Sequence, residues 1–177
     1  MRSIFQFVFT VTLFVFSLVS ESYAVTPVSG AEQRVFHIER SKNKNIVCYD
    51  ANILATRKLN TEKPVHIYWI NQTDHPGEKS DLNYVQNKLA YGYSHSKNSD
   101  GSVEISLMAF PDRKLNLSVD NRGVARGKML ISGKPAYLSK IYVQADPSNS
   151  LKVLYVDLFG IDVSTGTQVT ERIVHKN

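Results

Sequence analysis

Residues 103–109 read Val-Glu-Ile-Ser-Leu-Met-Ala, so that apolar and polar side chains alternate along most of the stretch. Successive side chains of a β-strand point to opposite faces, and this pattern therefore predicts a strand with one face in a hydrophobic core. The preceding residues 98–101, Asn-Ser-Asp-Gly, predict a hairpin turn, because Asp-Gly is a favoured pair in tight turns. Both signals, alternation and short polar turns, recur over most of the 177-residue chain.

Regularly spaced strands of this kind are typical of a β-sandwich or a β-barrel. Residues 65–71 are apolar on both faces, and we expect them in the sheet interior, covered on both sides. No repeat or linker divides the chain after its first two dozen residues. We therefore expect an all-β fold, an antiparallel sandwich or barrel of about eight to ten strands.

One segment departs from the alternation and predicts a short helix over about residues 80–89. Ser80 is placed to cap its N-terminus, and Leu82, Val85 and Leu89 fall on one side. Such a helix could close one end of a barrel or lie across an open side.

The first residues have the features of a secretory signal peptide. Arg2 supplies a positive charge, residues 4–19 are almost wholly apolar, and Ser22-Tyr23-Ala24 offers small residues two positions apart. The apolar run is shorter than the roughly 20 residues of a membrane-spanning helix, which favours a cleaved leader over a retained anchor. We expect a signal peptide over residues 1–24 and a single all-β domain over 25–177. The mature protein would be periplasmic or extracellular and not an integral membrane protein.

The net charge of +5 raises the question of an acidic partner. For an exported protein the candidates are lipid headgroups and anionic glycans, whereas nucleic acid is not expected. Most lysines and arginines alternate with apolar residues, which is typical of a solvated sheet face. The one cysteine, Cys48, cannot form an internal disulfide, and we expect it to be a small buried hydrophobic residue. The sequence does not indicate an oligomeric state.

No catalytic, metal or cofactor motif is present in the sequence, and an enzyme is therefore not favoured. The enzymatic alternative is a hydrolase or lyase whose base is His37 or His95. Its carboxylate would be Asp157, Glu39 or Glu104, held beside the histidine in a pocket. Asp157 stands in an apolar run, so it must face water, be paired or carry a raised pKa.

Two groups of side chains favour a binding surface instead. Residues 37–45 place many donors and acceptors in one strand end and turn, where Arg40 offers a planar fork for a carboxylate, phosphate or sulfate. Tyrosines with polar tips would suit a sugar, a lipid headgroup or a small amphiphile. Turn closure and core packing are the alternative roles of these residues. We expect a binding module for a small polar, amphipathic or anionic ligand, with the ligand-binding residues Arg40, Lys42, Asn43, Asn45, Tyr68, Tyr91 and Tyr93.

A third hypothesis is an interaction module of an envelope assembly, in which an exposed sheet edge pairs with a partner protein. This hypothesis predicts a flat apolar surface or an open edge and no pocket.

Five segments of the sequence, 37–45, 49–52, 64–69, 90–93 and 134–138, form a further pattern, of which the first reads His-Ile-Glu-Arg-Ser-Lys-Asn-Lys-Asn. In these segments the sequence resembles an uncharacterised family of exported bacterial proteins of Bacteroides-type organisms. It spans nearly the whole chain after the leader, and it implies a single domain in a Gram-negative envelope. The family carries no activity, ligand or catalytic residue that could be transferred.

Overall fold

The computed structural model describes residues 33–174, so the expected signal peptide lies outside the described residues. Strands dominate this part of the chain, and the all-β prediction is confirmed. Within it, no helix is both long enough and apolar enough to cross a membrane. The strands are β1 (Gln33–Arg40), β2 (Asn43–Ala51), β3 (Val65–Ile70), β4 (Lys79–Asp81), β5 (Tyr93–Lys97), β6 (Val103–Leu107), β7 (Phe110–Val119), β8 (Ala125–Ile131), β9 (Lys134–Ala145), β10 (Val153–Asp162) and β11 (Gln168–Val174).

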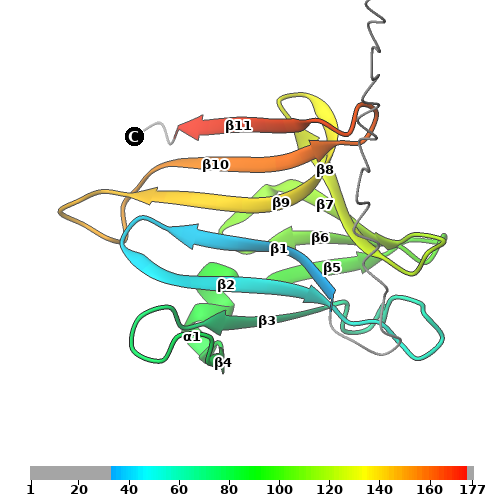
Figure 1. Ribbon diagram of the computed structural model, residues 1–177, viewed down its shortest axis with the longest axis horizontal. Helices are drawn as coiled ribbons and strands as arrows, with labels where there is room; N and C mark the ends of the chain where they lie inside the picture. Colours follow the sequence, from blue (N-terminus) through cyan, green and yellow to red (C-terminus); the bar gives the residue numbers. More distant parts are fainter. Residues whose placement is uncertain (1–32, 175–177) are drawn as a thin grey trace, which may run out of the picture.

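All of these strands belong to one sheet that curls into a half-barrel (Figure 1). The order is β4-β3-β2-β1-β9-β8-β7-β6-β5, and β10 and β11 continue from the other edge of β9. The start of β9 pairs with β8 and its later part with β1, so the sheet branches at β9. The β1–β9 pair is parallel, which corrects the expectation of a wholly antiparallel sheet. The two strands lie about a hundred residues apart, and no local pattern marks their pairing.

The core lies between the two layers that the curl of the sheet brings face to face. Phe36 of β1 stacks on Tyr49 of β2 with ring centroids 4.2 Å apart, and both rings are buried. The opposite layer contributes Val103, Ile105 and Leu107, the inward positions that the alternation predicts. Ala109, which continued the same pattern, is exposed because β6 ends at Leu107 and the chain turns there. Burial of such side chains is the main driving force for folding.

The helical segment is shorter than predicted and begins later. It consists of α1 (Tyr84–Gln86) and the π-helical turn η1 (Asn87–Tyr91). Asn83 caps it, and its side chain and that of Gln86 each accept the other's backbone N–H. Ser80, the expected cap, instead belongs to β4 and pairs with Trp69 of β3. Long-range strand pairing therefore overrides the local capping signal.

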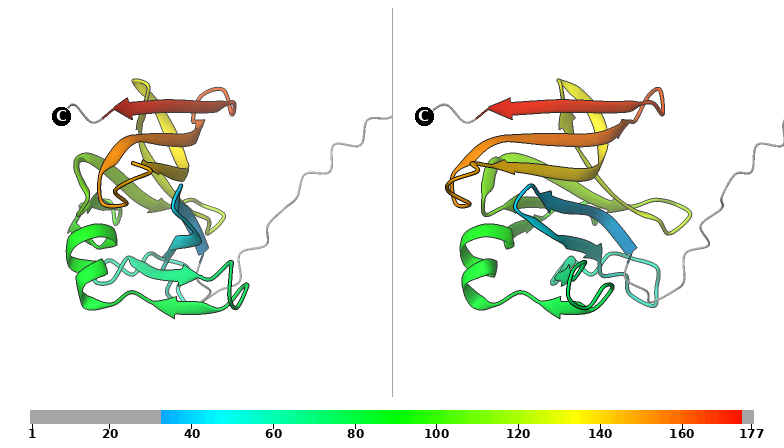
Figure 2. Two further views of the ribbon diagram at one scale, coloured as in Figure 1. Left: turned by 90° about the vertical axis from the view of Figure 1, so that its left-hand side faces the viewer. Right: turned by 60° about the vertical axis from the view of Figure 1, so that its left-hand side comes forward.

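The expected apolar side of this helix is only partly buried. Leu82 packs against the core, but Val85 and Leu89 are 59% and 74% exposed. The segment lies at one end of the half-barrel, on the same side as the β9–β10 loop (Figure 2). At its C-terminal end Ala90 and Tyr91 pack in the core. Val85 and Leu89, which the sequence pattern places on one side with Leu82, therefore face solvent.

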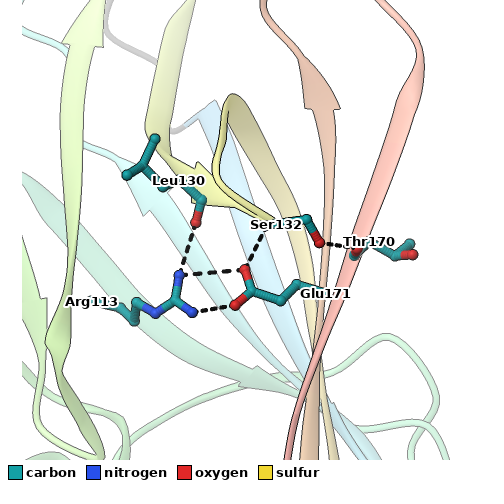
Figure 3. A network of polar contacts seen from close by, with 5 residues as sticks. All are labelled: Arg113, Leu130, Ser132, Thr170 and Glu171. Atoms are coloured by element: carbon teal, nitrogen blue, oxygen red, sulfur yellow. Dashed lines mark hydrogen bonds and ion pairs between the residues drawn. The ribbon is translucent and has the colours of Figure 1, made fainter.

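A polar network holds the last strand against the opposite layer (Figure 3). Arg113 of β7 donates hydrogen bonds to both carboxylate oxygens of Glu171 on β11 and to the carbonyl oxygen of Leu130. Glu171 also accepts the backbone N–H of Ser132 at 2.6 Å, and the Ser132 hydroxyl donates to the carbonyl oxygen of Thr170. Partial burial opposes ionisation of Glu171, but the hydrogen bonds from Arg113 and Ser132 outweigh it and lower the pKa of its carboxyl group.

This network should make the free energy of unfolding depend on pH in the acidic range. A carboxyl group whose pKa is lowered by folding stabilises the protein above its unfolded pKa of about 4.3, and this contribution is lost as the pH falls through the folded pKa. We expect Glu171→Gln to lower the free energy of unfolding by about 1 kcal/mol at neutral pH and by less near about pH 3. Urea unfolding of both proteins at the two pH values measures the difference. An equal cost at both values would contradict this account.

Candidate functional site

An apolar cavity of about 460 Å³ lies between the two layers of the half-barrel. It is found at the end where β1 and β9 finish and β10 begins, beside the helical segment. Its walls come from both layers, because β1, β9, β10 and β11 face the β6–β7 hairpin. The main apolar lining residues are Ile38, Ile141, Val143, Val156, Ile173 and Phe110.

Arg40 lies at this cavity as a half-buried cation. Its guanidinium group donates one hydrogen bond to the Tyr91 hydroxyl at 3.3 Å and another to the carbonyl oxygen of Ser150 at 2.8 Å. Within residues 33–174, no carboxylate forms an ion pair with it. Asp112 also lines the cavity, with an exposed side chain. The site thus combines an apolar interior with one unpaired guanidinium group.

Tyr91 is held in place from several directions. It is the last residue of η1, and its ring meets Trp69 edge to face at a centroid distance of 5.2 Å. The buried hydroxyl of Tyr49 donates to its backbone carbonyl oxygen at 2.6 Å. A Cβ atom at the following residue, Gly92, would come within 1.8 Å of the Asn87 carbonyl oxygen, so no larger residue fits there without a backbone shift. The Tyr91 hydroxyl is therefore a fixed partner for Arg40.

The three other polar residues predicted from the first hairpin do not line the cavity. The Lys42 amine donates to the carbonyl oxygen of Pro147 at 2.6 Å. The Asn43 side chain accepts the backbone N–H of Asn45 and so closes its own turn. Asn45 accepts the backbone N–H of Gln72 at 2.8 Å. These residues fix the loops around the cavity rather than its interior.

The predicted tyrosine face is not formed, since the three tyrosines lie in different places. Tyr91 is at the cavity, whereas Tyr68 lies on the outer face of β3, where its hydroxyl donates to Asp50 at 2.6 Å. Tyr93 lines a second, more polar cleft of about 500 Å³. There its hydroxyl bonds both backbone groups of Val65, and so joins the edge of β3 to β5.

The predicted catalytic residues are also scattered. The Nε2 atom of His37 lies 3.1 Å from the Oε1 atom of Glu39, but neither residue lines the cavity or the second cleft. His95 lines the second cleft. Asp157 is paired with Arg172 through two hydrogen bonds of 2.7 Å, which lower the pKa of its carboxyl group. Of the three options considered for Asp157, pairing is therefore the one observed.

One histidine–carboxylate pair was missed from the sequence. His66 lies 3.4 Å from Asp81, and both line the second cleft with His95. The two side chains meet because β4 pairs with β3. The sequence pattern had instead predicted Asp81 to lie in the helix over residues 80–89. No group of three His, Cys, Asp or Glu side chains in the described part of the chain is placed to hold a metal ion.

Cys48 is fully buried on β2, between His37 and Tyr68 of the neighbouring strands. Burial raises the pKa of its thiol to about 11. Because the thiolate is the reactive form, we expect the native protein not to react with a thiol reagent such as dithionitrobenzoate near neutral pH. The urea-unfolded protein should react fully. Rapid labelling of the native protein would contradict the burial of Cys48.

The fold and the cavity define an all-β half-barrel protein with an apolar end cavity. The chain belongs to the family described as Domain of unknown function (DUF4833), whose model matches residues 36–172. The resemblance to an uncharacterised family is thus confirmed, and the match spans parts of all eleven strands. Comparison with curated proteins finds no match, and neither does comparison with solved structures.

Proposed function

We propose that this protein binds a small anionic amphiphile. The apolar part of the ligand occupies the cavity, and its anionic headgroup contacts Arg40. The observation that carries this proposal is a half-buried guanidinium group at an apolar cavity, without a carboxylate partner among the described residues.

The size and chemistry of the cavity support such a ligand. Its volume of about 460 Å³ lies in the range of small-molecule sites, which are mostly apolar with a few placed polar groups. Arg40 uses two of its five N–H groups on Tyr91 and Ser150, which leaves donors for a carboxylate or phosphate oxygen. Because Arg40 is half-buried, its attraction for an anion is screened less than that of an exposed lysine.

Asp112 on the same cavity limits the charge of the ligand. A second anionic group near this carboxylate would be repelled, so the proposal specifies one anionic headgroup beside Arg40. We place this function in the periplasm or outside the cell, on the basis of the leader expected over residues 1–24.

The two alternative functions have less support. The hydrolase or lyase hypothesis rests on His37 or His95, and of these only His95 lines a described cleft, without Asp157, Glu39 or Glu104. The His66–Asp81 pair of that cleft is long for a hydrogen bond, and its Asp81 side chain is 89% exposed. An envelope interaction module would use an open sheet edge such as β11 and would need no cavity. The apolar cavity with Arg40 favours ligand binding over both.

The test compares decanoate with the uncharged decanol. Trp69 is the only tryptophan of the chain and contacts Tyr91, so its fluorescence should report ligand in the cavity. We expect the wild type to prefer decanoate. Arg40→Ala should lower the affinity for decanoate about tenfold or more and leave decanol binding nearly unchanged.

Arg122→Ala is the matched control, because this arginine is exposed in the β7–β8 turn and is not part of the cavity. It should not change the affinity for either ligand. The proposal is wrong if the wild type binds neither ligand, or if Arg40→Ala retains the full preference for decanoate.

A further inference from the structure

We infer that the end of the half-barrel that bears the cavity docks onto a membrane surface that contains anionic lipids. Large apolar side chains protrude there into solvent. Leu151 of the β9–β10 loop is 88% exposed, and Leu89 of η1 is exposed almost as much. Tyr84, Val85 and Met108 are further exposed apolar residues of the same end.

Contacts of the described residues place these side chains around one opening. Leu89 directly precedes Ala90 and Tyr91, which line the cavity. Met108 stands between two lining residues of the β6–β7 hairpin, and its backbone N–H donates to the Gly92 carbonyl oxygen after η1. Leu151 follows Ser150, whose carbonyl oxygen accepts a hydrogen bond from Arg40. Figures 1 and 2 show the helical segment and the β9–β10 loop at the same end of the molecule.

Basic side chains accompany the apolar ones. Lys88 of η1, Lys42 of the β1–β2 turn and Lys152 of the β9–β10 loop are exposed around the same opening. Asp112 and Asp146 are two carboxylates of this end, and the Asp146 carboxylate lies 3.9 Å from the Lys152 amine. Lys42, Lys88, Lys152 and Arg40 are the cations beside them. Apolar side chains among lysines complement an anionic lipid surface, where the apolar groups enter the interface and the lysines meet phosphates.

The shape of this end favours a lipid surface over a protein partner. The exposed apolar side chains stand on separate connections, namely the helical segment, the β6–β7 turn and the β9–β10 loop. Protein interfaces have an apolar core depleted of charge, whereas here lysines are interspersed with the apolar residues. Docking would also turn the cavity toward the lipid, so that an amphiphile could pass between them. The inference itself does not require an occupied cavity.

The experiment places an environment-sensitive fluorophore on one introduced cysteine at a time in the full chain. Leu151→Cys and Leu89→Cys test the docking end. Leu130→Cys is the matched control, because Leu130 is also exposed but does not line the cavity and pairs with Pro135 at the start of β9. The buried Cys48 should remain unlabelled. All variants share residues 1–32, so any contribution of that segment is common to them.

The probes are vesicles of phosphatidylcholine with phosphatidylglycerol and vesicles of phosphatidylcholine alone, each with brominated acyl chains as quencher. We expect the labels at 151 and 89 to shift to the blue and to be quenched on the anionic vesicles, while the label at 130 changes little. Replacing Lys88 and Lys152 with glutamine should lower the apparent affinity about tenfold or more. The same change at Lys128 and Lys134, exposed residues of β8 and β9, should not.

Docking is overturned if no label is quenched, if the label at 130 is quenched as strongly as that at 151, or if both vesicle types bind equally. These outcomes are separate from those for the proposed function, which is measured with dissolved decanoate. Normal decanoate binding without quenching would remove only the docking surface. Quenching without decanoate binding would remove only the ligand.

Discussion

Replacing Asp50 with alanine should lower the free energy of unfolding by about 2 kcal/mol. Asp50 lies on the outer face of β2, and only 4% of its surface is exposed. Its carboxylate forms an ion pair with Arg34 and accepts the Tyr68 hydroxyl at 2.6 Å, while Arg34 also donates to that hydroxyl at 3.0 Å. Removal of the carboxylate leaves the Arg34 cation and the buried Tyr68 hydroxyl without their principal partner.

Asp157→Ala is the matched control for this prediction, because Asp157 also pairs with an arginine on the outer face of the sheet. Its partner Arg172 is largely exposed, so water can replace the carboxylate, and we expect a much smaller loss. Urea unfolding followed by circular dichroism gives both values. Equal losses for the two variants would show that burial of Asp50 does not set its contribution.

The variant Val156→Trp should lower the affinity for decanoate about hundredfold. Val156 of β10 lines the cavity, and an indole ring at this position would occupy the space proposed for the acyl chain. Loss of most apolar contact area of a small ligand costs on the order of 2–3 kcal/mol, which corresponds to this change in affinity. Calorimetric titration is suitable here, because the added tryptophan would confuse the fluorescence signal.

The control is Tyr155→Trp at the adjacent position. Tyr155 lies on the other face of β10, where Arg172 stacks over its ring at 3.9 Å. This variant adds an indole ring outside the cavity, and decanoate should bind to it as to the wild type. Similar losses for both variants would indicate a general disturbance of β10 rather than a filled cavity.

The sequence predicts the strands well, because the two-residue period of a strand is a local property. Val103 and Ile105 are buried as their alternation requires. The helix was predicted less accurately. Ser80, the predicted N-cap, lies in β4 and pairs with β3, and Asn83 caps the helix instead. A capping signal can be judged only when the competing long-range pairs of its neighbours are known.

The candidate site could be predicted only in part. Arg40 and Tyr91 were both chosen for their chemistry, and the structure brings them to one cavity although 51 positions separate them. Tyr68 and Tyr93 were chosen for the same reason but lie elsewhere, because Tyr91 ends a helical turn while the other two belong to strands. Which side chains converge depends on the curl of the sheet, and no single segment of sequence encodes that curl.

Nuclear magnetic resonance can locate bound decanoate in the protein and so show whether the apolar cavity beside Arg40 holds an anionic amphiphile. We predict nuclear Overhauser effects from the acyl chain to the methyl groups of Ile38, Ile141 and Val156, with the carboxylate end nearest Arg40. Contacts confined to the outer face of the sheet, or none at saturating decanoate, would contradict the account.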